Sequence, residues 1–282
     1  MPKIIDVKEL DFIYMPGSPY EQNALKNISF SLDEGEFLGI FGPNGSGKST
    51  LVQLFNGLLS PGRGTVTVCD TDTADKKLRQ QLWKKVSLVF QYPEQQIFQI
   101  SVYDEVAYGP RNLGISETEV RQRVYLALEQ VGLIPEETIG VTPISLSGGM
   151  RRRVAIAGML ALNPEILVMD EPMAGLDPIG RKLILDIINN RKEHKLTSVM
   201  TSHNLKEIIA IADKIAIMDS GCLVFFGAVS ELLENNNILA KYRLELPDHI
   251  QLLSALAERG LKVNTNIRSL NEAALEILRL LA

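Results

Sequence analysis

GPNGSGKST, residues 42–50, is the stretch that decides the expected fold of this 282-residue chain. It follows the apolar run EFLGIF, which is typical of a buried parallel strand, and it precedes the helically spaced run LVQLFNGLL. Glycines at such a junction let backbone N–H groups turn onto phosphate oxygens, and the helix N-terminus adds partial positive charge. The stretch therefore predicts a nucleotide site in an α/β fold.

Side chains around this loop have distinct expected tasks. Lys48 should reach the β- and γ-phosphates, and the Ser49 hydroxyl should ligate Mg²⁺. No guanine-reading NKxD sequence occurs, so adenine is favoured, and Tyr14 is a candidate to stack on it, although a lone tyrosine more often packs. The alternative of a glycine-rich turn without a ligand is disfavoured by the strand and helix that flank the loop. The residues expected to contact ATP are Tyr14, Gly42, Asn44, Gly45, Gly47, Lys48, Ser49 and Thr50.

Two carboxylates and a histidine end other apolar runs. Asp170 and Glu171 close the run ILVMDE, at the kind of strand end where α/β sheets bind ligands. Asp170 suits the Mg²⁺ shell, and Glu171 suits a base that orients the attacking water. His203 ends TSVMTSH, where a ring N–H directed at a γ-phosphate would stabilise developing charge. Such an acidic pair is more often simply solvated and a lone histidine more often structural, but the buried run and Lys48 favour catalysis.

Composition narrows the class of protein. Apolar residues make up 45% and charged residues 22%, so a globular chain is expected rather than a disordered one. The net charge of −5 argues against an unaided nucleic-acid binder, and two distant cysteines form neither a zinc motif nor a disulfide framework. The N-terminal residues show no signal-peptide pattern, and the longest apolar-and-glycine run, VAIAGMLAL, is about half the roughly 20 residues of a membrane helix.

Strand-like and helical runs alternate along the chain, which predicts an α/β core. Helical patterns dominate from Gln91 to Leu162, and the tail carries two amphipathic patterns, DHIQLLSALAERG and LNEAALEILRLL. The expected parts are a core portion with antiparallel strands at 1–90, a helical subdomain at 91–162, a second core portion at 163–232 and a C-terminal extension at 233–282.

A second glycine-rich stretch, LSGGMRRR, spans residues 146–153, and MAGLDP follows the carboxylate pair. Its Ser147, Gly148 and Gly149 would open a helix and form an anion site without a lysine. One phosphate loop already serves the chain's own nucleotide. The second site is therefore expected to complete the nucleotide site of another copy.

The motifs, and their order along the chain, resemble those of the ATP-binding cassette (ABC) ATPases. The resemblance implies a P-loop NTPase fold with a RecA-like core, a helical subdomain and a small C-terminal extension containing helices. It also implies Mg²⁺-dependent ATP hydrolysis in a head-to-tail dimer, with each ATP between the Walker A loop of one copy and the signature of the other. The matches are Walker A at 42–50, the glutamine loop at Gln91, the signature at 146–150, Walker B at 166–171, the D-loop at 174–177 and the switch histidine at His203.

The same resemblance assigns roles to residues of this chain. Gln91 would sense the γ-phosphate and Mg²⁺, which explains why an apolar run ends on a polar side chain. The implied catalytic residues are Lys48, Gln91, Glu171 and His203, the implied metal ligands are Ser49, Gln91 and Asp170, and the implied signature contacts are Ser147, Gly148 and Gly149.

Longer phrases are similar to the energy-coupling factor (ECF) branch, whose ATPases drive uptake of vitamins and of cobalt or nickel ions. They include QYPEQQIF from residue 91, VYDEVAYGPRNLG from residue 102 and the tail LPDHIQLLSALAERG. The resemblance implies a homodimer or heterodimer of two related ATPases at the cytoplasmic face of the cell membrane. It further implies a transmembrane coupling protein (T component) and a substrate-binding membrane protein (S component). The tail is expected either to add dimer contacts or to form a small packing domain.

Residues 92–98 are expected to begin a groove for a coupling helix of the membrane partner, with Glu94, Asp104 and Glu105 as acids for its basic residues. The arginines at 151–153 raise the alternative of a nucleic-acid patch, but family membership and helix capping account for them better, so no nucleic-acid partner is expected.

One position departs from the family pattern. The signature usually ends in glutamine, and Met150 has no amide to bind the ribose of the partner's nucleotide. We expect weaker ATP-driven closure and retained hydrolysis, since such a hydrogen bond is worth about 1 kcal/mol.

Two other functions compete with import. A soluble cassette ATPase acting in assembly, as a chaperone or on nucleic acid would commonly fuse two cassettes or carry long coiled-coil inserts, and this chain has neither. A regulatory subunit without turnover is disfavoured because Lys48, Asp170, Glu171 and His203 are all present.

Overall fold

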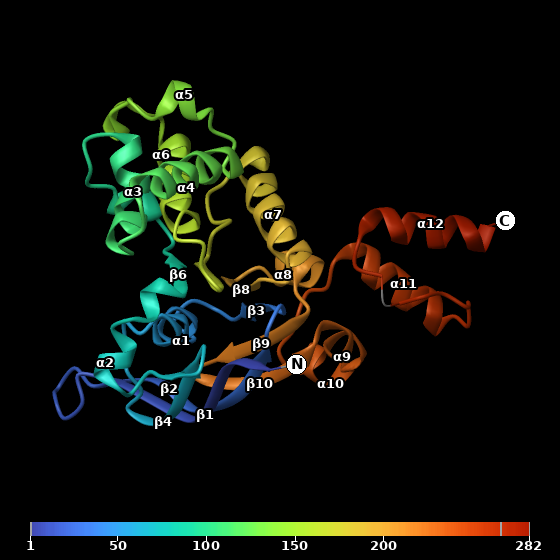
Figure 1. Ribbon diagram of the computed structural model, residues 1–282. Helices are drawn as coiled ribbons and strands as arrows, with labels where there is room; N and C mark the ends of the chain where they lie inside the picture. The colour runs from blue at the N-terminus through green and yellow to red at the C-terminus, as the bar shows by residue number, and fades with distance from the viewer. Residues whose placement is uncertain (1, 266, 282) are drawn as a thin grey trace.

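Two β-sheets form the body of the molecule, a lobe of helices stands on one side of them, and a pair of helices extends away from the body at the C-terminus (Figure 1). The computed structural model describes residues 2–265 and 267–281. No helix in these ranges is both long and apolar enough to cross a membrane.

The six-stranded sheet carries the ends from which the site is built. Five of its strands are parallel, and the edge strand β10 pairs antiparallel with β9. The central strands are buried along nearly their whole length because helices and the second sheet cover both faces. In sheet order the strands are β10 (Cys222–Ala228), β9 (Lys214–Asp219), β3 (Phe37–Phe41), β8 (Thr197–Ser202), β7 (Ile166–Asp170) and β6 (Val86–Val89).

Strand register brings the predicted motifs to one edge of this sheet. Phe41 at the end of β3 pairs with Ser202 of β8, and Asp170 at the end of β7 pairs with Thr201. The loops after these strands therefore leave the sheet side by side. The second sheet is antiparallel, in the order β2 (Gln22–Asp33), β1 (Lys3–Tyr14), β4 (Arg63–Val68) and β5 (Thr71–Asp72).

Three helices of the helical lobe begin at serine caps. The hydroxyls of Ser101, Ser116 and Ser147 accept backbone N–H groups in the first turns of α3, α4 and α6, and so satisfy donors that a helix start leaves unpaired. The lobe shares its apolar cluster with one face of the large sheet. Its elements are η2 (Pro93–Gln96), α3 (Val102–Asn112), α4 (Glu117–Gln130), α5 (Pro135–Thr138), η3 (Pro143–Ser145) and α6 (Gly148–Leu160).

The remaining helices lie against the sheets or follow them. A second apolar cluster fills the space between the two sheets and α1. These elements are α1 (Lys48–Phe55), α2 (Lys76–Arg79), η1 (Leu82–Lys84), α7 (Pro178–Glu193), α8 (Leu205–Ile211), α9 (Val229–Glu234) and α10 (Asn236–Lys241).

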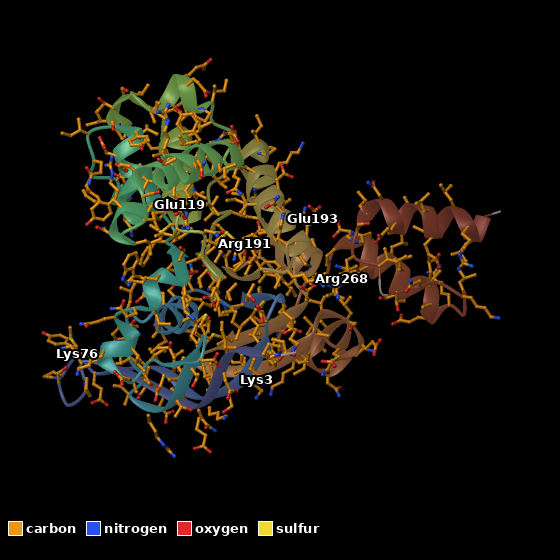
Figure 2. All side chains as sticks on the ribbon, in the orientation of Figure 1. Lys3, Lys76, Glu119, Arg191, Glu193 and Arg268 are labelled. Carbon is orange, nitrogen blue, oxygen red and sulfur yellow. The ribbon has the colours of Figure 1, made fainter. Side chains whose placement is uncertain are left out.

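The C-terminal pair, α11 (Asp248–Glu258) and α12 (Leu270–Leu281), has a small core of its own around Leu253, Ile267 and Ala273. Arg268, labelled in Figure 2, donates to the Ala212 carbonyl of the body at 2.6 Å. The two amphipathic patterns of the tail thus form helices as predicted. The α/β core with a helical insert is also found, and the exact boundaries of the four parts stay a prediction.

Candidate active site

The loop 42–50 needs glycine at two positions. Gly47 caps α1 at φ +100°, and a Cβ there would lie 2.6 Å from the Ala24 carbonyl oxygen. A Cβ on Gly42 would lie 2.4 Å from the Met218 carbonyl oxygen. The loop is thus held in a conformation that other residues would strain.

Lys48 is buried and turns back over the loop. Its ammonium donates to the carbonyl oxygens of Gly42, at 2.7 Å, and Pro43, at 3.1 Å. At the tip, Asn44 and Gly45 are exposed, and a Cβ on Gly45 would meet nothing within 4 Å. The exposed tip and the tethered lysine leave room for a ligand against the loop.

Glu171 is the point at which the predicted catalytic side chains converge. One carboxylate oxygen lies 3.5 Å from the Lys48 ammonium. The other accepts from the Gln91 amide at 3.4 Å and lies 3.0 Å from His203 Nδ1. Three residues from three separate segments therefore meet around one carboxylate, which is itself only 11% exposed.

Asp170 is held by a residue that the sequence did not indicate. The Thr201 hydroxyl donates to the Asp170 carboxylate at 2.5 Å and accepts the Glu171 N–H at 2.9 Å. Glu171 itself has φ +49°, a left-handed conformation that a non-glycine residue rarely adopts. Thr201 thus holds the Asp170 carboxylate and the Glu171 backbone together, and only strand register, which pairs it with Asp170, distinguishes it from the other residues of β8.

Tyr14 lies beside the loop, in contact with α1. Its hydroxyl shares a 3.1 Å hydrogen bond with Thr50, and its ring meets Phe12 edge to face at 4.8 Å. Ser49, the other hydroxyl of the first turn, is exposed. The structure thus places Tyr14 and Thr50 together beside the loop.

The second anion site stands apart from this cluster. Ser147 caps α6, and Gly148 and Gly149 are exposed, with open space where a Cβ would project. Between described residues, no hydrogen bond or ion pair joins these three to the loop 42–50. Met150, next in the signature, packs half-buried against the larger apolar cluster.

Arg152 has a position that capping does not explain, since Ser147 caps the helix. It is buried, and its terminal nitrogens donate to the carbonyls of Pro172, at 2.6 Å, and Ala174, at 3.1 Å. Burial lowers the pKa of Arg152, and nearby Glu94 opposes that shift. Helical spacing alone does not single out Arg152, because Arg152 and Arg153 lie four and three residues before the buried Ile156.

Comparison with known proteins identifies the family. The model of the ABC transporter family matches residues 25–174. This chain belongs to the ABC transporter ATPases. Among curated proteins it is 45% identical to the energy-coupling factor transporter ATP-binding protein EcfA2 of Caldanaerobacter subterraneus subsp. tengcongensis, over 98% of this chain and 97% of that protein. It is 44% identical to EcfA2 of Clostridium perfringens, over 98% of each chain. The expected membership of the ECF branch is confirmed.

Solved structures confirm the fold class. The chain is similar to cbiO1 from Clostridium perfringens, part of the ABC transporter complex cbiONQ, with a TM-score of 0.73 and 34% identity over 86% of this chain and 94% of that one. It is also similar to the ATP-binding cassette MJ0796, seen as a dimer bound to ADP and Pi, with a TM-score of 0.71 and 29% identity over 80% of this chain and 98% of that one.

Proposed function

We propose that this ABC ATPase is the ATP-hydrolysing subunit of an ECF importer that powers uptake of a vitamin or a cobalt or nickel ion. The convergence of Lys48, Gln91 and His203 on Glu171 carries the proposal, because a nucleophilic water needs a base beside groups that bind the γ-phosphate. The EcfA2 relatives support the transporter assignment.

The charges of the site account for the hydrolytic step. With ATP bound, the Lys48 ammonium turns from Glu171 and the loop carbonyls to the phosphates, which leaves Glu171 to orient the water. The His203 ring, 57% exposed and already on Glu171, is placed to donate to the γ-phosphate. The half-buried Tyr14, whose hydroxyl bonds to Thr50 in the first turn of α1, would provide the stacking surface for adenine.

The residues expected to hold Mg²⁺ fit that ion. Ser49, Gln91 and Asp170 supply hydroxyl, amide and carboxylate oxygens, the donors that a hard cation prefers. Within the described ranges no group of three His, Cys, Asp or Glu side chains gathers into a metal cage. A site with a single carboxylate, here Asp170, suits Mg²⁺, because this ion usually keeps waters and substrate phosphates among its ligands. When bound, the ion would neutralise charge on the γ-phosphate.

A second ATPase subunit completes the site. Ser147, Gly148 and Gly149 present open backbone at the start of α6, away from the chain's own phosphate loop. In a head-to-tail pair they would cap the nucleotide held by the partner. The partner is a second copy or a related ATPase, as either supplies the same elements. Exposed Leu275 and Leu278 on α12 favour the tail as an additional dimer contact.

The transmembrane coupling protein has a candidate docking site beside Gln91. A groove of about 490 Å³ runs between η2, α3, α6 and the end of β6. Phe98, 63% exposed, and Tyr108 meet edge to face at 5.0 Å on its wall. An apolar groove of this kind suits the apolar face of a helix. The chain would then sit on the cytoplasmic face of the membrane, with an S component capturing the substrate.

Of the three acids expected at this groove, two already have partners. Glu105 accepts the backbone N–H groups of Phe98 and Gln99, and Asp104 pairs with Arg111 at 3.0 Å. One carboxylate oxygen of Glu94 is buried and has no hydrogen-bond partner. Glu94 is therefore the acid best placed to respond to a partner.

Co-purification tests the proposal. A tag on this chain should recover a second cassette ATPase and a polytopic membrane protein from detergent-solubilised membranes. The variant Phe98→Ala/Tyr108→Ala should keep the ATPase partner and lose the membrane protein, because only the groove is damaged. Leu252→Ala, an equally exposed apolar side chain on α11, is the control. Recovery of soluble assembly factors or nucleic acid without a membrane protein would contradict the proposal.

A further inference from the structure

Two oppositely charged side chains on neighbouring elements each have one buried atom that lacks a hydrogen-bond partner in the described part of the chain. Among the described residues, the buried side-chain atoms without a hydrogen-bond partner include Arg152 Nε on α6 and Glu94 Oε2 on η2. These two elements pack against each other. Burying an unpaired polar atom is unfavourable, so a state in which both atoms are hydrogen-bonded would be favoured over this one.

Arg152 holds the turn that follows Glu171. Its two terminal nitrogens bind the carbonyls of Pro172 and Ala174, on either side of the buried Met173. Glu171 has a left-handed backbone conformation that only its surroundings can maintain. The guanidinium therefore helps to set where the Glu171 carboxylate points, although it does not touch the reacting atoms.

Glu94 connects this guanidinium to the groove. Pro93 and Gln96, which flank Glu94 on η2, line the groove from one side, and Ala155 and Met159 line it from α6. Burial lowers the pKa of Arg152, and the Glu94 carboxylate raises it, so the two charges already interact. A shift of η2 that brings the carboxylate to Nε would satisfy both atoms.

We propose that Arg152 is a positioning residue that fixes Glu171 and, through Glu94, makes the placement of Glu171 depend on what occupies the groove. Docking of the membrane partner moves η2, Glu94 pairs with Arg152, and the turn after Glu171 follows the guanidinium. The link between Arg152 and Glu171 is argued from contacts within this chain, whereas the link to docking rests on the proposed function.

Arg191 provides a matched control for the first link. Arg191 is labelled in Figure 2 and is as buried as Arg152. It donates to the carbonyls of Pro164, Glu165 and Thr197, at the ends of β7 and β8 opposite Asp170 and Ser202. Burial lowers the pKa of Arg191 to about 10. Replacing either arginine with glutamine removes a buried guanidinium from backbone carbonyls, but only Arg152 lies next to Glu171.

The test compares Arg152→Gln with Arg191→Gln in the assembly purified by a tag on this chain. Turnover per folded enzyme should fall by about tenfold or more in Arg152→Gln, because displacing a catalytic group by about 1 Å costs up to about 10²-fold. The Kd for ATP should stay within about twofold, since Arg152 does not touch the nucleotide site. Arg191→Gln should lower the melting temperature and leave turnover per folded enzyme unchanged.

A second pair of variants keeps the test decisive if Arg152→Gln does not fold. Arg152→Lys retains the charge and one donor and should lose turnover with little change in melting temperature. Glu94→Gln should lose the stimulation of turnover by the membrane partner. The double variant Glu94→Gln/Arg152→Lys should turn over ATP no more slowly than Arg152→Lys alone.

The outcomes separate the two proposals. If wild-type assembly hydrolyses no ATP, the proposed function fails. If wild type is active and Arg152→Lys equals it in turnover, the positioning role is overturned. If Glu94→Gln keeps full stimulation by the membrane partner, or adds its effect to that of Arg152→Lys, the connection to the groove is overturned.

Discussion

At the scale of single residues, the chemistry of the site depends on how a few side chains are held. Thr201 binds the Asp170 carboxylate and the backbone of Glu171, so the positions of these two residues are fixed relative to each other. The Lys48 ammonium lies 3.5 Å from the Glu171 carboxylate, and this contact satisfies a buried charge that would otherwise be costly. The charge proposed to bind phosphate therefore also stabilises the folded site.

The signature methionine belongs to this scale. Met150→Gln should tighten ATP binding in the dimer about fivefold, because an added hydrogen bond to the ribose is worth about 1 kcal/mol. It should also lower the melting temperature slightly, since Met150 packs against the apolar cluster. Nucleotide affinity and turnover of the assembled complex check this, with Leu160→Gln as the control because Leu160 packs against the same cluster from the same helix. Unchanged affinity and turnover would show that the ribose contact does not matter here.

Motif residues were predictable from sequence because each follows a buried strand with a defined end. Lys48, Gln91, Glu171 and His203 were all expected, and parallel register brings them together. Thr201 and Arg152 were not, for different reasons. A threonine inside a buried strand looks like an ordinary β-branched core residue, and one arginine of three in a row gives no sign of which is buried.

At the scale of secondary-structure elements, α6 joins the parts of the molecule. Its first turn presents Ser147 and the two glycines, its second turn sends Arg152 to the turn after Glu171, and its later turns line the groove. A rigid helix moves all three together, so a displacement at the signature reaches the catalytic base and the groove. Helical spacing predicted the element but not these three contacts.

The α11–α12 pair has its own small core and an outward apolar face. If this face contacts the partner ATPase, Leu275→Glu/Leu278→Glu should weaken dimer formation without unfolding the pair, because both side chains are already exposed. Sedimentation of the purified ATPase over a concentration series measures the change, with Leu126→Glu on α4 as the control for an exposed leucine elsewhere. Equal dimerisation of wild type and variant would make the tail a packing domain only.

At the scale of the whole molecule, the site is divided between two lobes of one chain. The sheet edge carries the loop 42–50, the carboxylates and the histidine, and the helical lobe carries the second glycine-rich stretch. Among the described residues, no hydrogen bond or ion pair joins that stretch to the loop 42–50. The α/β class and the helical insert followed from the alternation of apolar runs. The separation of the two glycine-rich stretches in space could not be predicted from the sequence, because it depends on how the lobes pack rather than on local pattern.

Because the site is divided in this way, ATP binding should join two subunits. Hydrolysis with Glu171 as the base should then allow them to separate. Replacing Glu171 with glutamine keeps its size and removes the base, so bound ATP should survive and hold the pair closed.

The most direct test is the ATP turnover of Glu171→Gln in the purified assembly, followed by gel filtration with ATP and Mg²⁺. We predict that turnover falls by about 10²-fold or more while ATP stays bound and the two ATPase subunits elute together. Undiminished turnover in this variant would contradict the assignment of Glu171 as the base, and with it the central claim.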